Sequence, residues 1–284
     1  MLKGSPLTVG HIAYANCEPF FHFLRTSGFN GTVLDGVPAQ LNRFLAAGEL
    51  DLSPSSSFEY LRNWREYQLL PGMSISSDGP VKSVLLFSPY PIESLRGEEI
   101  FLTGESASSV HLLQVLLREY FSFDEVLCRV PEEALETYIR QGRPALLIGD
   151  RALKTSGEVP REHIYDLGEL WCQYSGLPFV FALWIIRRDS VERCGQEVSV
   201  FYNQLRNSLA LAFEDLSSVA RNLPAYSWYG EQQLIEYWQS MSYGLDNRQL
   251  QGLLRYAELL VKYGFLSELP EIDFVDLIEG ESAR

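Results

Sequence analysis

Three segments of the chain place small polar residues between an apolar run and the start of a helical pattern. They are residues 14–17 (YANC), 53–57 (SPSSS) and 103–109 (TGESASS). The N-terminus of a helix has unpaired N–H groups and about half a positive charge, so it binds carboxylates or phosphates without Lys or Arg. Several such segments in one cleft would suit a small molecule with two negative charges. Capping of the helices alone would also explain each segment taken singly, so both interpretations stay open.

Two further features have competing interpretations. Asp150 follows an apolar run and Gly149, and it is either a cleft residue or the cap of the next helix. The alternating residues Phe179, Phe181 and Trp184 would suit a pocket for a flat ring. Aromatic residues on a buried strand more often belong to the core, and we favour that interpretation.

The sequence Gly104-Glu105-Ser106 begins like the nucleophile elbow of serine hydrolases. That elbow needs a closing glycine and a later histidine. Ser108 stands at the position of the closing glycine, and His163 lies in an ordinary loop sequence. We therefore do not expect a serine hydrolase.

The composition excludes several classes of partner and cofactor. The formal net charge of −14 leaves no basic stripe for nucleic acid. The four cysteines form no C-x-x-C pair, and no nucleotide-binding or metal-binding motif occurs, so we expect neither a cofactor nor a metal. No segment resembles a signal peptide or a membrane span, which predicts a cytoplasmic protein without a membrane partner.

The elements that must position these residues follow an α/β pattern, in which short apolar runs alternate with amphipathic stretches and most strands are parallel. Strands are expected over six apolar runs: 7–13, 50–53, 83–88, 99–103, 145–148 and 179–186. Helices are expected from Pro19, from Pro38 to Gly48, from Ser56, and over 110–117, 190–222, 229–240 and 247–264.

The chain is expected to cross between two lobes near Pro89-Tyr90-Pro91 and to return near residue 184. Lobe I then comprises residues 1–89 and 185–284, with the C-terminal helices, and lobe II comprises residues 90–184. A cleft between two such lobes is the natural place for a ligand.

Several blocks, taken in order, resemble the chorismate dehydratases of the futalosine route to menaquinone. The block GHIAYANCEPFF resembles their first strand and Y-x-N-x-x-P motif, and four other blocks are similar: GVPAQLNRFLAAGELDLSPSSSFEY, VKSVLLFS, LTGESASSVHLLQVLL and ALLIGDRAL. The most specific match is DLGELW followed by GLPFVFALW. Ala15 stands where a larger residue is frequent. Cys17 replaces a common Ser or Thr, which weakens any role for a hydroxyl at that position.

The resemblance implies a two-lobed, periplasmic-binding-protein type II-like fold that acts as a lyase without a cofactor. The implied reaction removes water from chorismate and gives 3-[(1-carboxyvinyl)oxy]benzoate. Asn16 is the catalytic candidate, because it is expected to orient the ring or the leaving hydroxyl. The residues expected to bind the substrate are Ser55, Ser56, Ser83, Thr103, Ser106, Ala107, Ser108, Ser109 and Asp150.

The base that removes the hydrogen at ring C3 has three candidates: Glu18, Asp150 and the enolpyruvyl carboxylate of the substrate itself. Hydroxyls and helix N-termini would stabilise the negative charge that builds on the ring carboxylate. A non-catalytic binding protein or sensor for a small carboxylate is the alternative function. The C-terminal helices are compatible with either a monomer or a homodimer.

Overall fold

The computed structural model describes residues 6–160 and 163–278. The chain forms two compact units, of which unit 1 comprises Met1–Ser74, Ala182–Trp238 and Pro270–Arg284, and unit 2 comprises Ile75–Phe181 and Gln239–Leu269. Residues 239–269, which the sequence pattern assigned to lobe I, therefore belong to unit 2.

The chain passes from unit 1 to unit 2 inside the long strand β4 (Tyr67–Ser77) and returns inside β10 (Phe179–Arg187). The expected crossing at Pro89-Tyr90-Pro91 instead lies within unit 2. There it leads from β5 (Val84–Phe87) into a short 3-10 helix, Ile92–Leu95, and the Tyr90 side chain is half exposed. Proline suits such a turn because it fixes φ and has no N–H to leave unpaired.

One sheet has six strands in the order β11-β4-β10-β3-β1-β2. The strands not yet given are β1 (Thr8–Ile12), β2 (Thr32–Gly36), β3 (Leu52–Ser56) and β11 (Ser242–Gly244), the last of which belongs to unit 2. β1 pairs in parallel with both β2 and β3, whereas β10 is antiparallel to β3. The carboxyl ends of β1, β2 and β3 therefore lie at the same edge of the sheet.

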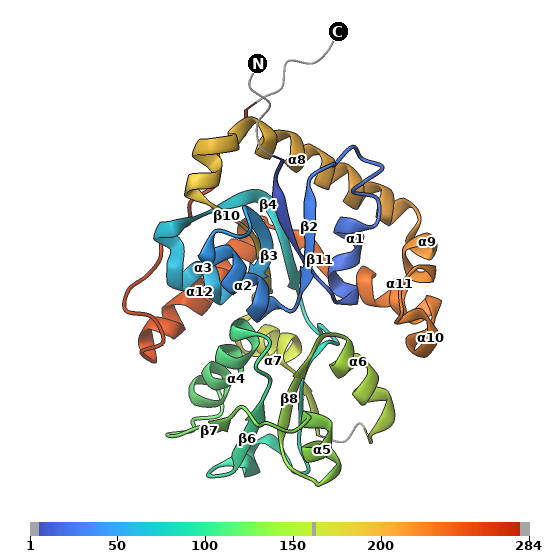
Figure 1. Cartoon of the computed structure of the whole chain (residues 1–284). Coiled ribbons are helices and arrows are strands. Elements are labelled where there is room, and N and C mark those ends of the chain that lie inside the picture. The colour runs from blue at the N-terminus through green and yellow to red at the C-terminus, as the bar shows by residue number, and fades with distance from the viewer. Residues whose placement is uncertain (1–5, 161–162, 279–284) are drawn as a thin grey trace. The chain divides into compact units, whose positions relative to one another are not determined.

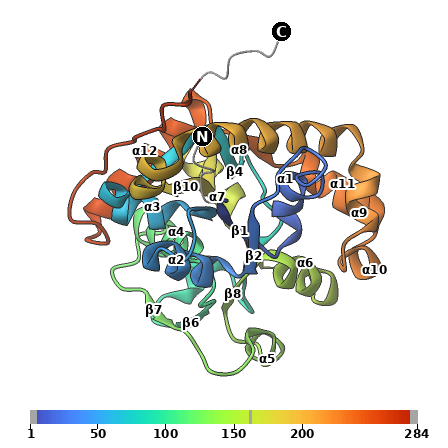
Figure 2. The same ribbon diagram turned by 45° about the horizontal axis from the view of Figure 1, so that its top comes forward.

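Seven helices in the described part of unit 1 surround this sheet: α1 (Glu18–Phe21), α2 (Pro38–Ala47), α3 (Ser57–Asn63), α8 (Arg188–Glu214), α9 (Leu216–Arg221), α10 (Tyr226–Tyr229) and α11 (Glu231–Gln239). The short α1 packs along the long α8, as Figures 1 and 2 show. The helix expected over 190–222 is divided at Asp215, whose side chain caps α9.

The aromatic residues of β10 belong to the core, as favoured above. Trp184 is 1% exposed, and its ring packs against Phe20 of α1 and Phe201 of α8. In unit 2, Phe179 is also 1% exposed and packs against Trp171 and Tyr256. Neither ring is available to line a ligand pocket.

The second sheet has five strands in the order β7-β6-β8-β5-β9 and lies in unit 2. Its other strands are β6 (Glu99–Leu102), β7 (Leu127–Arg129), β8 (Ala145–Ile148) and β9 (Ile164–Asp166). β6 pairs in parallel with β7 and β8, but β5 is antiparallel to both β8 and β9. Both sheets are thus mixed, because β10 runs antiparallel to β3 in the first sheet and β5 runs antiparallel to β8 and β9 in the second.

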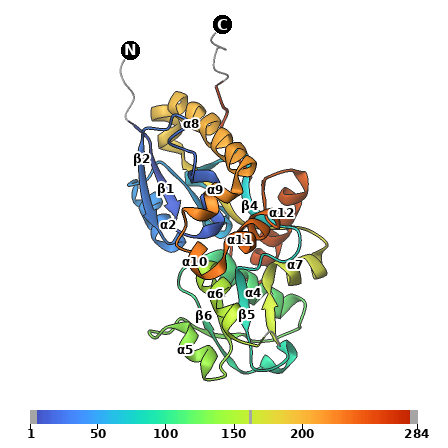
Figure 3. The same cartoon turned by 90° about the vertical axis from the view of Figure 1, so that its right-hand side faces the viewer.

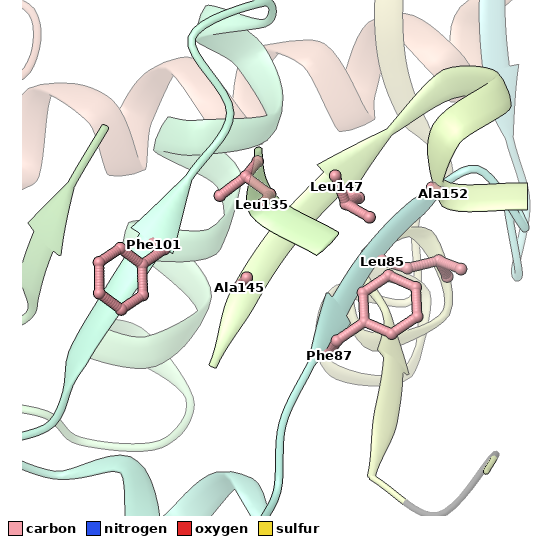
Figure 4. Close-up of a cluster of buried hydrophobic side chains, with 7 residues drawn as sticks. All are labelled: Leu85, Phe87, Phe101, Leu135, Ala145, Leu147 and Ala152. Atoms are coloured by element: carbon pink, nitrogen blue, oxygen red, sulfur yellow. The ribbon is translucent and has the colours of Figure 1, made fainter. Parts of the chain in front are cut away.

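Helices pack on both faces of this second sheet: α4 (Ala107–Glu119), α5 (Leu135–Arg140), α6 (Gly149–Glu158), α7 (Leu167–Ser175) and α12 (Asn247–Lys262). Figure 4 shows the core on one face, where Leu135 of α5 and Ala152 of α6 cover Leu85, Phe101 and Leu147 of the strands. Figure 3 shows α7 on the opposite side of the strands from α5. Contacts of α4 with α7 and with α12 complete that second layer.

Close approaches of the backbone to other atoms require glycine at several positions, of which Gly252 and Gly10 are examples. A Cβ atom at Gly252 of α12 would lie 2.0 Å from the carbonyl oxygen of Pro178, and one at Gly10 of β1 would lie 2.4 Å from Ser53 Oγ. Both distances are far below van der Waals contact. Gly252 thereby allows α12 to pack directly on the loop that precedes β10.

Candidate functional site

Unit 1 brings Asn16, Ser55 and Ser56 to one edge of its sheet. Asn16 lies in a 3-10 turn, Ala15–Cys17, just after β1, and the two serines are the last residues of β3. Because β1 and β3 are parallel, these positions share the carboxyl edge, where ligands of α/β proteins bind. The indole N–H of Trp238 donates to the Ala15 carbonyl at 2.7 Å and fixes the turn that carries Asn16.

The hydrogen of the Ser56 hydroxyl remains available for an acceptor, because the hydroxyl oxygen accepts from two protein groups. Its oxygen accepts from the backbone N–H of Glu59 at 3.3 Å, which caps α3, and from the side-chain amide of Asn42 at 3.4 Å. A hydroxyl has two lone pairs and one hydrogen. With both lone pairs occupied, the hydrogen of Ser56 can only be donated, which suits a carboxylate.

Two polar atoms beside Ser56 are buried without a partner among the described residues. They are Ser55 Oγ and Asn42 Oδ1, and their residues are 0% and 8% exposed. Buried polar groups are nearly always hydrogen-bonded, so such a pair is a typical place for a polar ligand. Asn42 was missed from the sequence, although an Asn on the buried face of an otherwise apolar helix is a recognisable signal.

Unit 2 brings Ser83, Thr103 and Asp150 to one edge of the five-stranded sheet. Val84 pairs with Ile148 and Leu102 pairs with Leu146, so the start of β5 and the ends of β6 and β8 coincide. The N–H of Gly149 donates to the Ser83 carbonyl at 2.8 Å. Ser83 and Thr103 are buried there, 2% and 3% exposed.

The N-terminus of α4 lies at this same edge and carries the four remaining predicted residues. Ser106 caps the helix, since its Oγ accepts from the N–H of Ser109 at 3.3 Å, and its Oγ also lies 3.0 Å from Ser109 Oγ. If Ser106 donates in this pair, the hydroxyl hydrogen of Ser109 remains for another acceptor. If Ser109 donates, the hydroxyl hydrogen of Ser106 remains. Ala107 begins the helix, and the Ser108 carbonyl accepts from the buried Tyr256 hydroxyl at 3.1 Å.

Asp150 is not the cap of α6. The helix begins at Gly149 and the cap position is held by Ile148, which makes no side-chain cap, so Asp150 lies inside the first turn. Its side chain is partly exposed. A carboxylate in the first turn is stabilised by the positive end of the helix. The cap interpretation is therefore wrong, and a role for Asp150 in the site stays a prediction.

Asp166 fixes the segment that leads to Ser83. Its carboxylate accepts four backbone N–H groups, those of Val81, Lys82, Gly168 and Glu169, at 2.6–3.2 Å. Burial raises the pKa of this carboxyl, and the four N–H donors only partly offset the effect. Asp166 begins the DLGELW block, so one role of this block is to fix the segment that leads to Ser83.

Two residues next to Asn16 are poor candidates for direct chemistry. Cys17 is 0% exposed, and burial raises the pKa of its thiol well above the usual value, so the reactive thiolate does not form. Glu18, one of the candidate bases, points its Oε1 at His11 Nε2, 3.2 Å away.

A cavity of about 610 Å³ in unit 2 adjoins Thr103 but does not suit a dianion. Its wall includes Glu105, Glu132, Glu133 and Glu136. The one guanidinium in its wall, Arg151, makes two hydrogen bonds to Glu136 at 2.7 and 2.8 Å. That pairing lowers the pKa of Glu136, so the cavity stays negatively charged. Among the residues predicted to bind substrate, Thr103 alone lines this cavity.

In the described ranges 6–160 and 163–278, no group of three or more His, Cys, Asp or Glu side chains could hold a metal ion. Within the same ranges, no helix is long and apolar enough to cross a membrane.

Sequence comparison assigns the chain to a family. A sequence model described as menaquinone biosynthesis matches residues 7–262. The chain belongs to the menaquinone biosynthesis family. A member from Thermus thermophilus, named chorismate dehydratase, is 36% identical over 270 residues, which cover 90% of this chain and 95% of that protein.

Solved structures place this family member in the periplasmic-binding-protein fold. A protein from Archaeoglobus fulgidus has a TM-score of 0.73 at 19% identity and covers 92% of this chain and 98% of its own. A Candida albicans protein described as having the generic periplasmic binding protein fold has a TM-score of 0.69 at 11% identity, with 98% and 99% covered. The aliphatic sulphonate binding protein of Escherichia coli has a TM-score of 0.68 at 12% identity, with 98% and 95% covered. The expected fold class is thus confirmed.

Proposed function

We propose that this chain is a chorismate dehydratase, a hydro-lyase that converts chorismate to 3-[(1-carboxyvinyl)oxy]benzoate without a cofactor. The observation that carries the proposal is the 36% identity to a chorismate dehydratase over 90% of the chain. The two polar sheet edges support it, because each offers hydroxyl hydrogens that protein atoms have not taken: Ser56 in unit 1, and Ser106 or Ser109 in unit 2.

The substrate fits these donors. Chorismate has two carboxylates, one on the ring and one on the enolpyruvyl group. Hydrogen bonds in which one partner is charged are about twice as strong as neutral ones. We propose that hydroxyl donors of this kind bind the carboxylates of chorismate, so that a chain with a net charge of −14 needs no Lys or Arg for this purpose.

The reaction breaks the C3–H and C4–O bonds of the ring. The hydrogen at C3 leaves as a proton, and its electron pair is conjugated through the C1–C2 double bond to the ring carboxylate. Donors that are already oriented toward this carboxylate stabilise the charge that develops on it. The electron pair then forms the C3–C4 double bond as hydroxide leaves C4 and is protonated to water, and the ring becomes aromatic.

The base is best assigned to the substrate. Glu18 is directed at His11 rather than at the Asn16 turn, and Cys17 is buried as a thiol. The enolpyruvyl carboxylate is attached to C3 through the ether oxygen and can reach the C3 proton within the same molecule. Asp150, partly exposed at the start of α6, is the alternative base.

Asn16 has the role of orienting the ring or the leaving hydroxyl. It is a partly exposed residue on a turn whose Ala15 carbonyl accepts a hydrogen bond from Trp238, so the backbone at Asn16 is held in place. An amide can both donate to and accept from a hydroxyl. It would thereby hold the C4 hydroxyl in the direction needed for departure.

The test is incubation of the purified protein with chorismate, without added metal or cofactor, and analysis of the products by chromatography with mass detection. We expect an aromatic product lighter by one water. In the variant Asn16→Ala we expect kcat to fall about 100- to 1000-fold, as for the loss of one oriented donor. Full turnover by Asn16→Ala would remove Asn16 from the mechanism. Chorismate that binds in equilibrium dialysis but is recovered unchanged would favour the alternative, a binding protein or sensor.

A further inference from the structure

His11 of β1 lies between two carboxylates that come from different elements. Its Nδ1 is 2.9 Å from Asp35 Oδ1 in β2, and its Nε2 is 3.2 Å from Glu18 Oε1 at the start of α1. His11 and Asp35 are register partners in the parallel pair β1–β2. The ring of Phe21 covers the imidazole, with centroids 4.2 Å apart.

This arrangement, with a carboxylate near each ring nitrogen, favours a protonated imidazole. A neutral imidazole has one N–H, so it can donate to only one of the two carboxylates and presents a lone pair to the other. The imidazolium has two N–H groups and a positive charge: its Nδ1–H donates to Asp35, and its Nε2–H lies within ion-pair distance of Glu18 without a well-aligned hydrogen bond. Of the described residues, Glu18 from α1 and Asp35 from β2 are the charged groups that act on His11, and both favour the cation.

Electrostatics agree with the geometry. Burial alone lowers the pKa of His11, but the hydrogen bonds and charges of Glu18 and then Asp35 outweigh burial and raise the pKa above the usual value. The Glu18 carboxylate has the greater influence, because its side chain is 18% exposed whereas that of Asp35 is 73% exposed and more strongly screened.

The residues between these partners form the turn that carries Asn16. β1 ends at Ile12, and residues 13–17 lead from it to α1 at Glu18, so the contact from His11 to Glu18 closes a loop around Asn16. We propose that protonated His11 is a positioning residue, which ties α1 to β1 and β2 and so holds Asn16 in its working orientation. The proposal rests on chorismate dehydration as the function of the chain.

The direction in which pH changes the stabilisation follows from the positive charge of the His11 imidazolium. The stabilisation by His11 is fully present below its pKa in the unfolded chain, and it is lost as pH rises through the raised pKa of the folded protein. We therefore expect kcat to fall about threefold to tenfold across that pH range, since one charged, partly buried contact is lost.

Activity profiles against pH test the proposal. In His11→Gln the alkaline fall should disappear and kcat should be low at every pH. In His11→Lys, whose cation persists to higher pH, the activity should be restored and the fall should move to higher pH. The control His163→Gln should keep the wild-type profile. A wild-type profile in His11→Gln, or no difference between His11→Gln and His11→Lys, would overturn the proposal.

A measurement that needs no turnover separates this proposal from the proposed function. Nuclear magnetic resonance of the histidine rings, with the His11 signal assigned by its absence in His11→Gln, should give a pKa for His11 above about 6.5, and Glu18→Gln should lower it. A pKa below that value, or no change in Glu18→Gln, would contradict the proposal. The expected titration in a protein that leaves chorismate unchanged would reject the dehydratase function alone.

Discussion

At the scale of single residues, the site depends on which direction each hydroxyl hydrogen points. Ser56 is a donor because Glu59 and Asn42 occupy both lone pairs of its oxygen. Such a donor is already oriented before a carboxylate binds, so the hydrogen bond forms without reorganisation of its surroundings. We therefore propose that Asn42 favours an anion as the acceptor of the Ser56 hydrogen, without having to contact the anion itself.

This role predicts an order among variants at position 42. Asn42→Leu leaves one lone pair of Ser56 free and should raise KM for chorismate about 3- to 10-fold. Asn42→Asp should raise KM more, about 10- to 100-fold, because the new carboxylate accepts the Ser56 hydrogen and repels the substrate. The measurement is steady-state kinetics.

A matched control exists for the position-42 variants. Asn207 donates to the Ser27 hydroxyl at 3.0 Å, but on an exposed surface, and Asn207→Asp should leave KM unchanged. If Asn42→Asp binds chorismate as well as the wild type does, the Ser56 hydrogen is not used for the substrate.

The candidate residues could be named from the sequence, but their partners could not. Asn16, Ser56 and Ser106 are recognisable because small polar residues follow apolar runs at helix starts. The donor direction of Ser56 depends on Asn42, which lies 14 positions away, and the hydrogen bond of His11 Nδ1 is made with Asp35, 24 positions away. Such pairs are set by strand register and helix packing, which no local pattern encodes.

At the scale of elements, local signals were reliable where the chain is regular. Asp246 and Gln249 have the spacing of a capping box, as do Ser56 and Glu59. At Asp246 and Gln249 both hydrogen bonds of the box are present, and α12 begins at Asn247, as the expected helix over 247–264 does. At Ser56 and Glu59 the box is half formed, because the Glu59 carboxylate pairs instead with Arg62 and Asn63.

The largest element missed was β4, an 11-residue strand interrupted by Pro71 and Gly72. Proline and glycine are typical of turns, so the sequence pattern argues against a strand there. Long-range pairing overrides this preference: the N–H of Leu69 donates to the Asp273 carbonyl and the Leu69 carbonyl accepts from Val275. A segment over 200 positions away in the chain thus stabilises the strand.

Helix packing in unit 2 gives a test with an internal control. Gly252→Ala places a methyl group 2.0 Å from the Pro178 carbonyl oxygen and should lower the free energy of unfolding by about 1–3 kcal/mol. Gly157→Ala, in α6, meets no atom within 4 Å and should raise it by about 0.5–1 kcal/mol, because alanine restricts the unfolded chain. Urea titrations measure both changes. Equal stabilities of the two variants would show that α12 does not depend on this close contact.

At the scale of the whole molecule, the chain combines a net charge of −14 with a substrate that has two negative charges. The overall field therefore opposes binding, and affinity must come from local donors. We propose that hydroxyls and helix starts at one edge of each sheet are these donors. The fold class was predictable from the alternation of apolar runs and helices. The assignment of residues 239–269 to unit 2 was not, because it follows from packing of α12 on α4.

The most direct test uses chorismate that carries deuterium at ring C3. If the protein removes the C3 hydrogen and the C4 hydroxyl, the aromatic product has lost the label and is lighter than the substrate by one molecule of HDO. Deuterium retained in the product would contradict removal of the C3 hydrogen. Labelled chorismate recovered intact after prolonged incubation would contradict the dehydratase function itself.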